Sequence, residues 1–296
     1  MRKCSLSNLL ENKLTSEELR LVYKSYDIVG DIAVIRVPEK LKGRTAIIAE
    51  ALMGSQKHLK AVWRQTSAVN GEFRLRDLER VAGEKRAVTH HTEHGCVFKV
   101  DLLNCYFSPR LAYERMRIAQ LVKAGEVVVN MFAGVGSFSI IIARHSRVER
   151  VYSIDVNPLA FEYMWENVLL NHVVNRVVPL SGDAKTVVME RLQSTADRVL
   201  MPLPEKAYEY LDCAVTTLRP KGGWVHYYDF AHARKGEDPV EKVKAKISRK
   251  LSQLNVDFAL PFGRIIRSTG PRWQQVAVDV QIRTRTCDKS FMSHSR

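Results

Sequence analysis

The sequence has few of the features that define small secreted, membrane or metal-binding proteins. Its five cysteines are scattered without a CxxC pair, so the sequence predicts neither a disulfide framework nor a zinc ribbon. No apolar run approaches the roughly 20 residues that a membrane span needs. The N-terminus also has no continuous apolar stretch of signal-peptide length. We therefore expect a cytoplasmic protein without a transmembrane helix.

The composition is that of a globular protein with a basic surface. Of the 296 residues, 46% are hydrophobic and 26% are charged, and the length allows one sizeable core plus a smaller domain. The formal net charge of +14 favours a polyanionic partner, because basic side chains release counterions from phosphates. Charge alone also serves solubility, so this interpretation needs support from motifs.

The first part of the chain, residues 1–107, predicts a small α+β domain. Residues 16–23 and 41–53 have helical patterns, and residues 31–37 alternate like a strand before Pro38. Residues 87–100 predict a hairpin that turns near His94 and Gly95. No internal repeat interrupts this region.

From Ser108 the pattern becomes a regular alternation of helix and strand, which predicts a doubly wound, Rossmann-like parallel sheet over residues 108–283. Two last strands, near 263–267 and 276–283, are expected to pair as an antiparallel edge, and residues 284–296 to form a frayed tail. The predicted helices are 111–124, 137–145, 158–171 and 206–218, and the predicted strands are 127–129, 151–154, 177–180, 199–201 and 224–228.

Three strand ends in this second domain have residues suited to a ligand. Gly134 and Gly136 lie between a buried strand and a helix, where glycines allow a ligand to approach the backbone. Asp155 ends the next strand at the spacing of an acid that binds ribose hydroxyls, and Asp183 ends the third. A helix N-cap is the alternative for each acid. No third glycine occupies the pyrophosphate-contacting position, which favours S-adenosylmethionine over a dinucleotide.

Several segments along the chain form a recognisable set: 71–76, 82–84, 89–95, 106–111 followed by Glu114 and Arg115, 130–136 and 155–158. Together they resemble one family, the archaeal and eukaryotic tRNA guanine-37 N1-methyltransferases with their wyosine-pathway members. The resemblance runs from about Tyr26 to Asp279. It implies a class I methyltransferase fold, S-adenosylmethionine as cofactor and the tRNA anticodon loop at position 37 as substrate.

The resemblance also implies roles for individual residues. Arg74 of the small domain would stabilise the purine oxygen, and Glu114 would take the N1 proton, which makes sense because neutral guanine N1 is a poor nucleophile. A salt bridge or phosphate contact is the alternative for Arg74, and an exposed pair with Arg117 is the alternative for Glu114. The expected cofactor-binding residues are Tyr106, Arg115, Phe132, Gly134, Gly136, Asp155, Val156, Asn157, Asp183, Ala184 and Met201.

The chain departs from the family at the fourth strand, where Pro202 replaces the usual substrate-orienting Asn. Methyl transfer is therefore expected to guanine N1, to carbon 7 of the tricyclic wyosine precursor, or to both. Aminocarboxypropyl transfer to that precursor and a catalytically silent tRNA-binding module are the alternatives. We also expect a monomer without the additional N-terminal domain of many relatives.

Three other groups of residues, histidine, aromatic and basic, each have more than one interpretation. His90, His91 and His94 lie on the hairpin, where adjacent side chains alternate faces, so we expect RNA-facing groups and no metal site. The aromatic cluster near 227–230 could stack on an extruded base or pack in the core. The basic residues of 242–250 could contact phosphate or form a solvated helix face.

Overall fold

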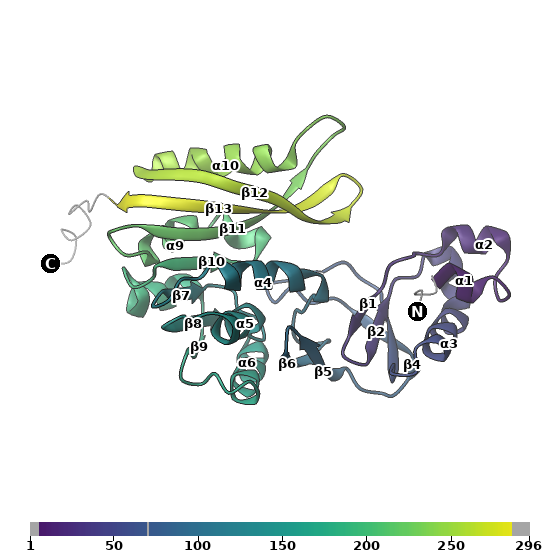
Figure 1. The fold of residues 1–296 in the computed structure, drawn as a ribbon. Helices are drawn as coiled ribbons and strands as arrows, with labels where there is room; N and C mark the ends of the chain where they lie inside the picture. The colour runs from purple at the N-terminus through teal and green to yellow at the C-terminus, as the bar shows by residue number, and fades with distance from the viewer. Residues whose placement is uncertain (1–5, 70, 286–296) are drawn as a thin grey trace. The chain divides into compact units, whose positions relative to one another are not determined.

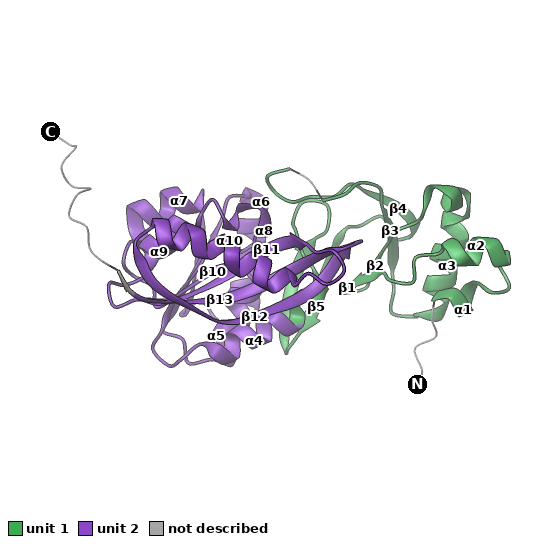
Figure 2. Cartoon of the chain, turned by 90° about the horizontal axis from the view of Figure 1, so that it is seen from above, with its two compact units in different colours: residues 1–112 green, residues 113–296 purple. Residues whose placement is uncertain are grey.

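The computed structural model describes residues 6–69 and 71–285. The chain divides into two compact units, residues 1–112 and 113–296 (Figure 2). Within the described residues, none of the helices has the length and apolar character to cross a membrane.

The first unit is built on a four-stranded sheet of order β1-β2-β3-β4 (Figure 1). One apolar core joins this sheet to the helices, with Leu10, Leu41 and Leu52 almost fully buried. Thr15 and Glu18 form a capping box that begins α2. The strands are β1 (Asp27–Val29), β2 (Ile32–Ile35), β3 (Ala61–Gln65) and β4 (Leu78–Gly83), and the helices are α1 (Leu6–Leu10), α2 (Ser16–Leu21), η1 (Glu39–Arg44) and α3 (Thr45–Ser55).

The predicted hairpin is confirmed as β5 (Val88–Glu93) and β6 (Cys96–Asp101), which pair antiparallel. His94 and Gly95 form its two-residue turn with φ values of 49° and 71°. Two successive positive φ values match the right-handed twist of the flanking strands. A 3-10 helix, η2 (Pro109–Leu111), follows and leads to the second unit.

The second unit contains a seven-stranded sheet of order β12-β13-β11-β10-β7-β8-β9. All neighbours pair in parallel except at β13, which is antiparallel to both β11 and β12. The strand order reverses between β7 and β10, which makes this a doubly wound sheet as predicted. The strands are β7 (Val127–Asn130), β8 (Arg150–Asp155), β9 (Val177–Ser181), β10 (Arg198–Met201), β11 (Gly223–His232), β12 (Val256–Gly270) and β13 (Trp273–Arg285).

Helices cover both faces of this sheet (Figures 1 and 2). The main core lies under α9 and α10 and includes Val225, Tyr227 and Val278, whereas the intervening strand residues face the other side. The predicted helix over 206–218 is in fact two helices interrupted near Tyr210. The helices are α4 (Ala112–Leu121), α5 (Ser137–His145), α6 (Pro158–Leu170), α7 (Ala184–Val187), η3 (Val188–Leu192), α8 (Pro204–Ala207), α9 (Leu211–Thr217) and α10 (Pro239–Gln253).

The last two strands pair antiparallel as predicted, but they are much longer than predicted and occupy different positions. Strand β13 lies inside the sheet between β11 and β12, so at this side of the sheet β12 is the edge strand. Strand β13 also continues to Arg285, two residues beyond the end predicted for the domain. The remainder of the predicted tail, 286–296, lies outside the described residues.

The turn before β11 comes very close to β13. Gly222 has a φ of 84°, and a Cβ built on it would lie 2.2 Å from the carbonyl oxygen of Ile282. Gly236 has a similar φ of 88° but open space around its Cβ position. An alanine at either position would have a strained backbone, but only an alanine at Gly222 would also overlap a neighbouring strand.

We expect Gly222→Ala to lower the free energy of unfolding by about 2 kcal/mol more than Gly236→Ala does. Both alanines adopt a left-handed conformation that costs about 1–2 kcal/mol, but only the first meets a strand backbone that must move. Urea unfolding of the two variants measures the difference. Equal losses would show that the β11–β13 spacing adapts freely.

A carboxyl-edge site and a buried ion-pair network

The glycine loop after β7 lies at the carboxyl edge of the parallel sheet. Gly134 and Gly136 have φ values of 56° and 85°, and Gly136 is the residue before α5. A Cβ on Gly136 would lie 3.0 Å from Cγ of Met164, so a side chain there would crowd the packing of α6. The sequence places glycine where the loop needs left-handed backbone and close packing.

Asp155, at the end of β8, holds this loop in place. One carboxylate oxygen accepts a hydrogen bond from the Gly134 N–H at 2.6 Å, and the other accepts one from the Asn157 N–H at 3.0 Å. Burial raises the pKa of the Asp155 carboxyl, against the opposing effect of the two backbone hydrogen bonds. The helix-cap alternative is wrong for Asp155, because Asn157 caps α6 through bonds from Leu159 and Ala160.

Asp183 follows β9, and here the helix-cap interpretation is confirmed. One carboxylate oxygen accepts from the backbone N–H groups of Lys185 and Thr186, which caps α7. The other accepts a short hydrogen bond from the Tyr210 hydroxyl. The Tyr210 ring meets Phe132 of the glycine loop edge to face, with centroids 5.2 Å apart. The ligand-binding role of Asp183 stays a prediction.

Three more of the predicted cofactor residues, Val156, Ala184 and Met201, lie on the same edge, whereas Arg115 lies buried on α4. Met201 is the last residue of β10 and is fully buried, and the half-buried Pro202 follows it. Val156 follows Asp155 and is 38% exposed, whereas Ala184 begins α7 and is buried. Parallel strands end together at one edge, so the sheet collects these residues from four separate chain segments.

Glu114 is buried on α4, and both of its carboxylate oxygens accept hydrogen bonds. Arg117 Nε donates to one carboxylate oxygen at 2.9 Å, and Arg117 Nη2 donates to the other at 2.8 Å. The Tyr228 hydroxyl of β11 donates to the second oxygen at 2.9 Å. The pair with Arg117 was the predicted alternative, but the expected exposure is wrong, because Glu114 is only 1% exposed.

Arg117 also binds a second carboxylate, that of Asp279 on β13. Its Nη1 and Nη2 donate to the two Asp279 oxygens at 2.7 and 3.0 Å. Burial opposes the charge of Arg117, but the hydrogen bonds that it donates to Glu114 and Asp279 raise its pKa. Burial likewise opposes the charge of Asp279, but hydrogen bonds from His226 and Arg117 lower its pKa.

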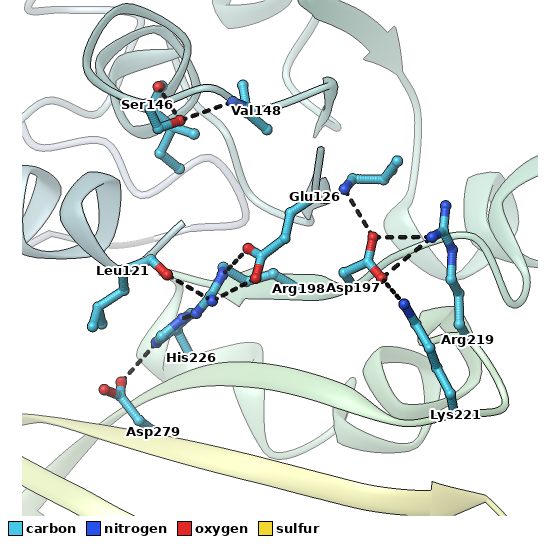
Figure 3. Close-up of polar contacts among 12 residues, drawn as sticks. Leu121, Glu126, Ser146, Val148, Asp197, Arg198, Arg219, Lys221, His226 and Asp279 are labelled. Carbon is cyan, nitrogen blue, oxygen red and sulfur yellow. Dashed lines mark hydrogen bonds and ion pairs between the residues drawn. The ribbon is translucent and has the colours of Figure 1, made fainter. Parts of the chain in front are cut away.

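The network continues through His226 to Arg198 and Glu126 (Figure 3). His226 Nδ1 lies 2.6 Å from Asp279, and its Nε2 lies 2.6 Å from Arg198 Nη1. A guanidinium can only donate, so Nε2 accepts and Nδ1 carries the proton. Burial lowers the pKa of His226, which agrees with a neutral imidazole. Arg198 in turn pairs with Glu126 at 2.8 Å.

Arg74 and Tyr106, two further predicted site residues, belong to the first unit. Arg74 lies in a turn with a φ of 57°, an uncommon conformation for a residue other than glycine. Tyr106 lies half-buried in the loop between β6 and η2. Their predicted roles stay predictions.

The structure also shows the contacts of the aromatic cluster near 227–230, of the basic residues on α10 and of the hairpin histidines. Tyr227 and Tyr228 are buried and bonded through their hydroxyls, so for them core packing is confirmed. On α10, Lys242, Lys244 and Lys246 each form an ion pair. On the hairpin, the Gly30 N–H lies 3.1 Å from Nδ1 of His91.

Five residues of these clusters were not predicted from the sequence: Tyr210, Asp279, His226, Arg198 and Glu126. Asp279 and Arg117 are 162 positions apart, and Asp183 and Tyr210 are 27 apart. The i,i+3 spacing of Glu114 and Arg117 on a helix was the one local signal. Nothing in a single sequence indicates that Asp279 joins them.

The sheet order and its carboxyl-edge site define the Rossmann-like class I methyltransferase fold. Two family descriptions match the chain: the TRM5/TYW2 methyltransferase domain over residues 89–256 and the TYW2 N-terminal domain over residues 6–86. The chain therefore belongs to the TRM5/TYW2 family, and the family predicted from the sequence is confirmed.

Curated relatives include enzymes with two chemistries. The tRNA (guanine(37)-N(1))-methyltransferase Trm5b of Pyrococcus abyssi is 40% identical, over 89% of this chain and 76% of the relative. The tRNA 4-demethylwyosine(37)-methyltransferase Taw21 of Saccharolobus solfataricus is 39% identical, over 88% and 94%. A tRNA(Phe) (4-demethylwyosine(37)-C(7)) aminocarboxypropyltransferase of Methanocaldococcus jannaschii is 32% identical, over 86% and 97%.

Solved structures agree with this family. Trm5b from Pyrococcus abyssi has a TM-score of 0.83 and 38% identity, covering 95% of this chain and 81% of that one. A complex of aTrm5 with tRNALeu has a TM-score of 0.80 and 33% identity, covering 95% and 79%. Pyrococcus horikoshii TYW2 in complex with MeSAdo has a TM-score of 0.76 and 25% identity, covering 95% and 98%.

We expect the free energy of unfolding to decrease as the pH falls below about 6.5, in part because of His226. Its pKa is lowered in the folded state, so only the unfolded chain takes up the proton there. His226→Gln keeps a neutral donor and acceptor and should flatten this slope. Urea titrations at several pH values measure it, with the exposed His58→Gln as control. An unchanged slope in His226→Gln would mean that His226 is charged in the fold.

Proposed function

We propose that this chain is an S-adenosylmethionine-dependent tRNA methyltransferase that modifies the purine at position 37. It acts on guanine N1, on carbon 7 of the tricyclic wyosine precursor, or on both. The main structural support is the carboxyl edge, where the glycine loop, Asp155 and Asp183 lie at successive strand ends. Family membership and the names of the relatives support the choice of tRNA.

The residues at this edge fit a nucleoside that has no phosphate. The loop is held by a carboxylate, Asp155, where a phosphate would meet electrostatic repulsion. Carboxylates accept hydrogen bonds from ribose hydroxyls, which gives Asp155 its role. Gly134 and Gly136 would let the nucleoside approach the backbone, and Asp183 would meet the adenine. Apolar contacts would come from Phe132, Val156, Ala184 and Met201, and further contacts from Tyr106, Arg115 and Asn157.

When bound, the cofactor supplies an electrophilic methyl group on its sulfonium. Glu114 accepts the proton from guanine N1 onto a carboxylate oxygen, and Arg74 stabilises the negative charge that develops on the purine oxygen. The oxygen of Glu114 that faces Arg117 Nε accepts that one hydrogen bond, and a carboxylate oxygen can accept two. An acceptor position therefore exists for the substrate proton.

Methyl transfer is the preferred reaction, since the relatives at 40% and 39% identity are methyltransferases. The relative at 32% identity keeps aminocarboxypropyl transfer as the second candidate. Pro202 has no side-chain donor for the target base, which weakens the preference for guanine N1 over the tricyclic base.

The proposed partner is tRNA, without a metal ion or membrane. The net charge of +14 suits a polyphosphate, and the small domain, residues 1–107, is proposed to recognise the tRNA while residues 108–283 perform the transfer. We further propose a cytoplasmic monomer.

The test of the proposed function is incubation of the full chain and S-adenosylmethionine with two tRNAs, one with unmodified guanosine 37 and one with the tricyclic precursor. Mass spectrometry of the anticodon-loop nucleosides distinguishes a methyl from an aminocarboxypropyl group by mass. We expect a methyl group on at least one substrate. Cofactor binding with no modification of either tRNA would favour a silent tRNA-binding module.

Two acid-to-amide variants should affect different steps. Glu114→Gln should reduce the single-turnover rate at least about 100-fold, as expected for loss of a general base, with little change in cofactor affinity. Asp155→Asn should weaken cofactor binding about tenfold or more, because it removes a charged acceptor from the ribose site. Calorimetry with S-adenosylmethionine measures the affinities. A full rate in Glu114→Gln would remove this residue from the base role.

A further inference from the structure

We propose that Asp279 is a positioning residue that keeps Glu114 basic by sharing Arg117 with it. The inference rests on the proposed role of Glu114 as the base. It explains why a residue expected to take a proton is held by a guanidinium, the group that most opposes proton uptake.

The geometry of Arg117 is that of a shared cation. Its Nη2 donates to Glu114 at 2.8 Å and to Asp279 at 3.0 Å, and each carboxylate has a second bond to a different nitrogen. Arg117 is 13% exposed, Glu114 1% and Asp279 7%, so water screens these charges little. One positive charge therefore lies between two negative ones, and this group of three has a net charge of −1.

The next residues of the network keep Asp279 charged. His226 is opposite Asp279 in the register of β11 and β13, and its Nδ1–H donates to the carboxylate. Arg198 prevents His226 from taking a second proton, because a guanidinium donates to Nε2. Glu126 and the Leu121 carbonyl oxygen hold Arg198 in place. His226 thus gives Asp279 a hydrogen bond without cancelling its charge.

The charged and titratable groups around Glu114 come from three elements. Arg117 lies on its own helix, and the Cζ of the neighbouring Arg115 lies 5.7 Å from the Phe138 ring centroid. Tyr228 of β11 donates to Glu114, and burial raises the pKa of Tyr228 well above its usual value, so it stays a neutral donor. Asp279 of β13 interacts with Glu114 indirectly, because both carboxylates are bonded to Arg117. Asp279 is thus the second negative charge on Arg117 and the one that lowers the attraction of Arg117 for Glu114.

Two substitutions should move the acidic limb of the pH–rate profile in opposite directions. In Asp279→Asn, Glu114 is the one remaining carboxylate bonded to Arg117. The positive charge then stabilises the charged form of Glu114 more strongly, so the acidic limb should move to lower pH by about one unit. The rate above the limb should drop about tenfold because the base is weaker. Arg117→Gln removes the counter-ion, so the limb should move to higher pH. A residue that only supports the fold would not produce shifts of opposite sign.

The experiment measures single-turnover methylation of tRNA by the full chain across the acidic limb, together with cofactor affinity and melting temperature. Cofactor affinity should stay within about twofold in Asp279→Asn. Asp279→Glu retains the charge and should keep the wild-type limb even if its rate falls. The matched control is Asp197→Asn, an ion-paired aspartate near Arg219 and Lys221 (Figure 3), which should keep both rate and limb.

The outcomes distinguish this inference from the proposed function. An acidic limb at the wild-type pH in Asp279→Asn, with Glu114→Gln inactive, would overturn the role of Asp279 and leave the base intact. A fully active Glu114→Gln would overturn both. If Arg117→Gln does not fold, because two carboxylates are left facing each other, the pair Asp279→Asn and Asp279→Glu still decides the question by charge alone.

Discussion

The parallel arrangement of β7, β8, β9 and β10 is the constraint on which the site depends. Because these strands run in one direction, their carboxyl ends and the loops that follow them meet at one edge. The hydrogen bond from the Gly134 N–H to Asp155 joins two of these loops directly. Strand pairing thus brings together the residues of the proposed cofactor site before any side chain contributes affinity.

The alternation of side chains along β11 separates two environments in adjacent residues. Tyr227 enters the apolar core under α9 and α10, whereas His226 and Tyr228 lie on the opposite face with Glu114 and Asp279. Charged groups lose much of their hydration when they are buried, so they persist only with well-placed partners. Here Glu114 and Asp279 both pair with Arg117 and also accept a hydrogen bond from a neutral donor, which holds α4 against β11 and β13.

Membership of the TRM5/TYW2 family establishes the fold, but it does not establish which group is transferred. Relatives of similar fold transfer either a methyl or an aminocarboxypropyl group, as their names state. S-adenosylmethionine carries both groups on one sulfonium, so the choice depends on the placement of groups around the target base. We propose that Pro202 and the hydrogen bonds of Glu114 are the features of this chain that bear most directly on that choice.

The sequence by itself determined the local elements and the residues that end the parallel strands. Helical and strand periodicity, together with glycines and acids at strand ends, predicted β7 to β11, α5, α6 and the residues at the carboxyl edge, because each of these signals lies within a few positions of the chain. Only the tertiary structure decided that β13 enters the sheet and brings Asp279 to Arg117, 162 positions away. Contacts at such separation depend on how strands pair, and a single sequence contains no periodic signal of that pairing.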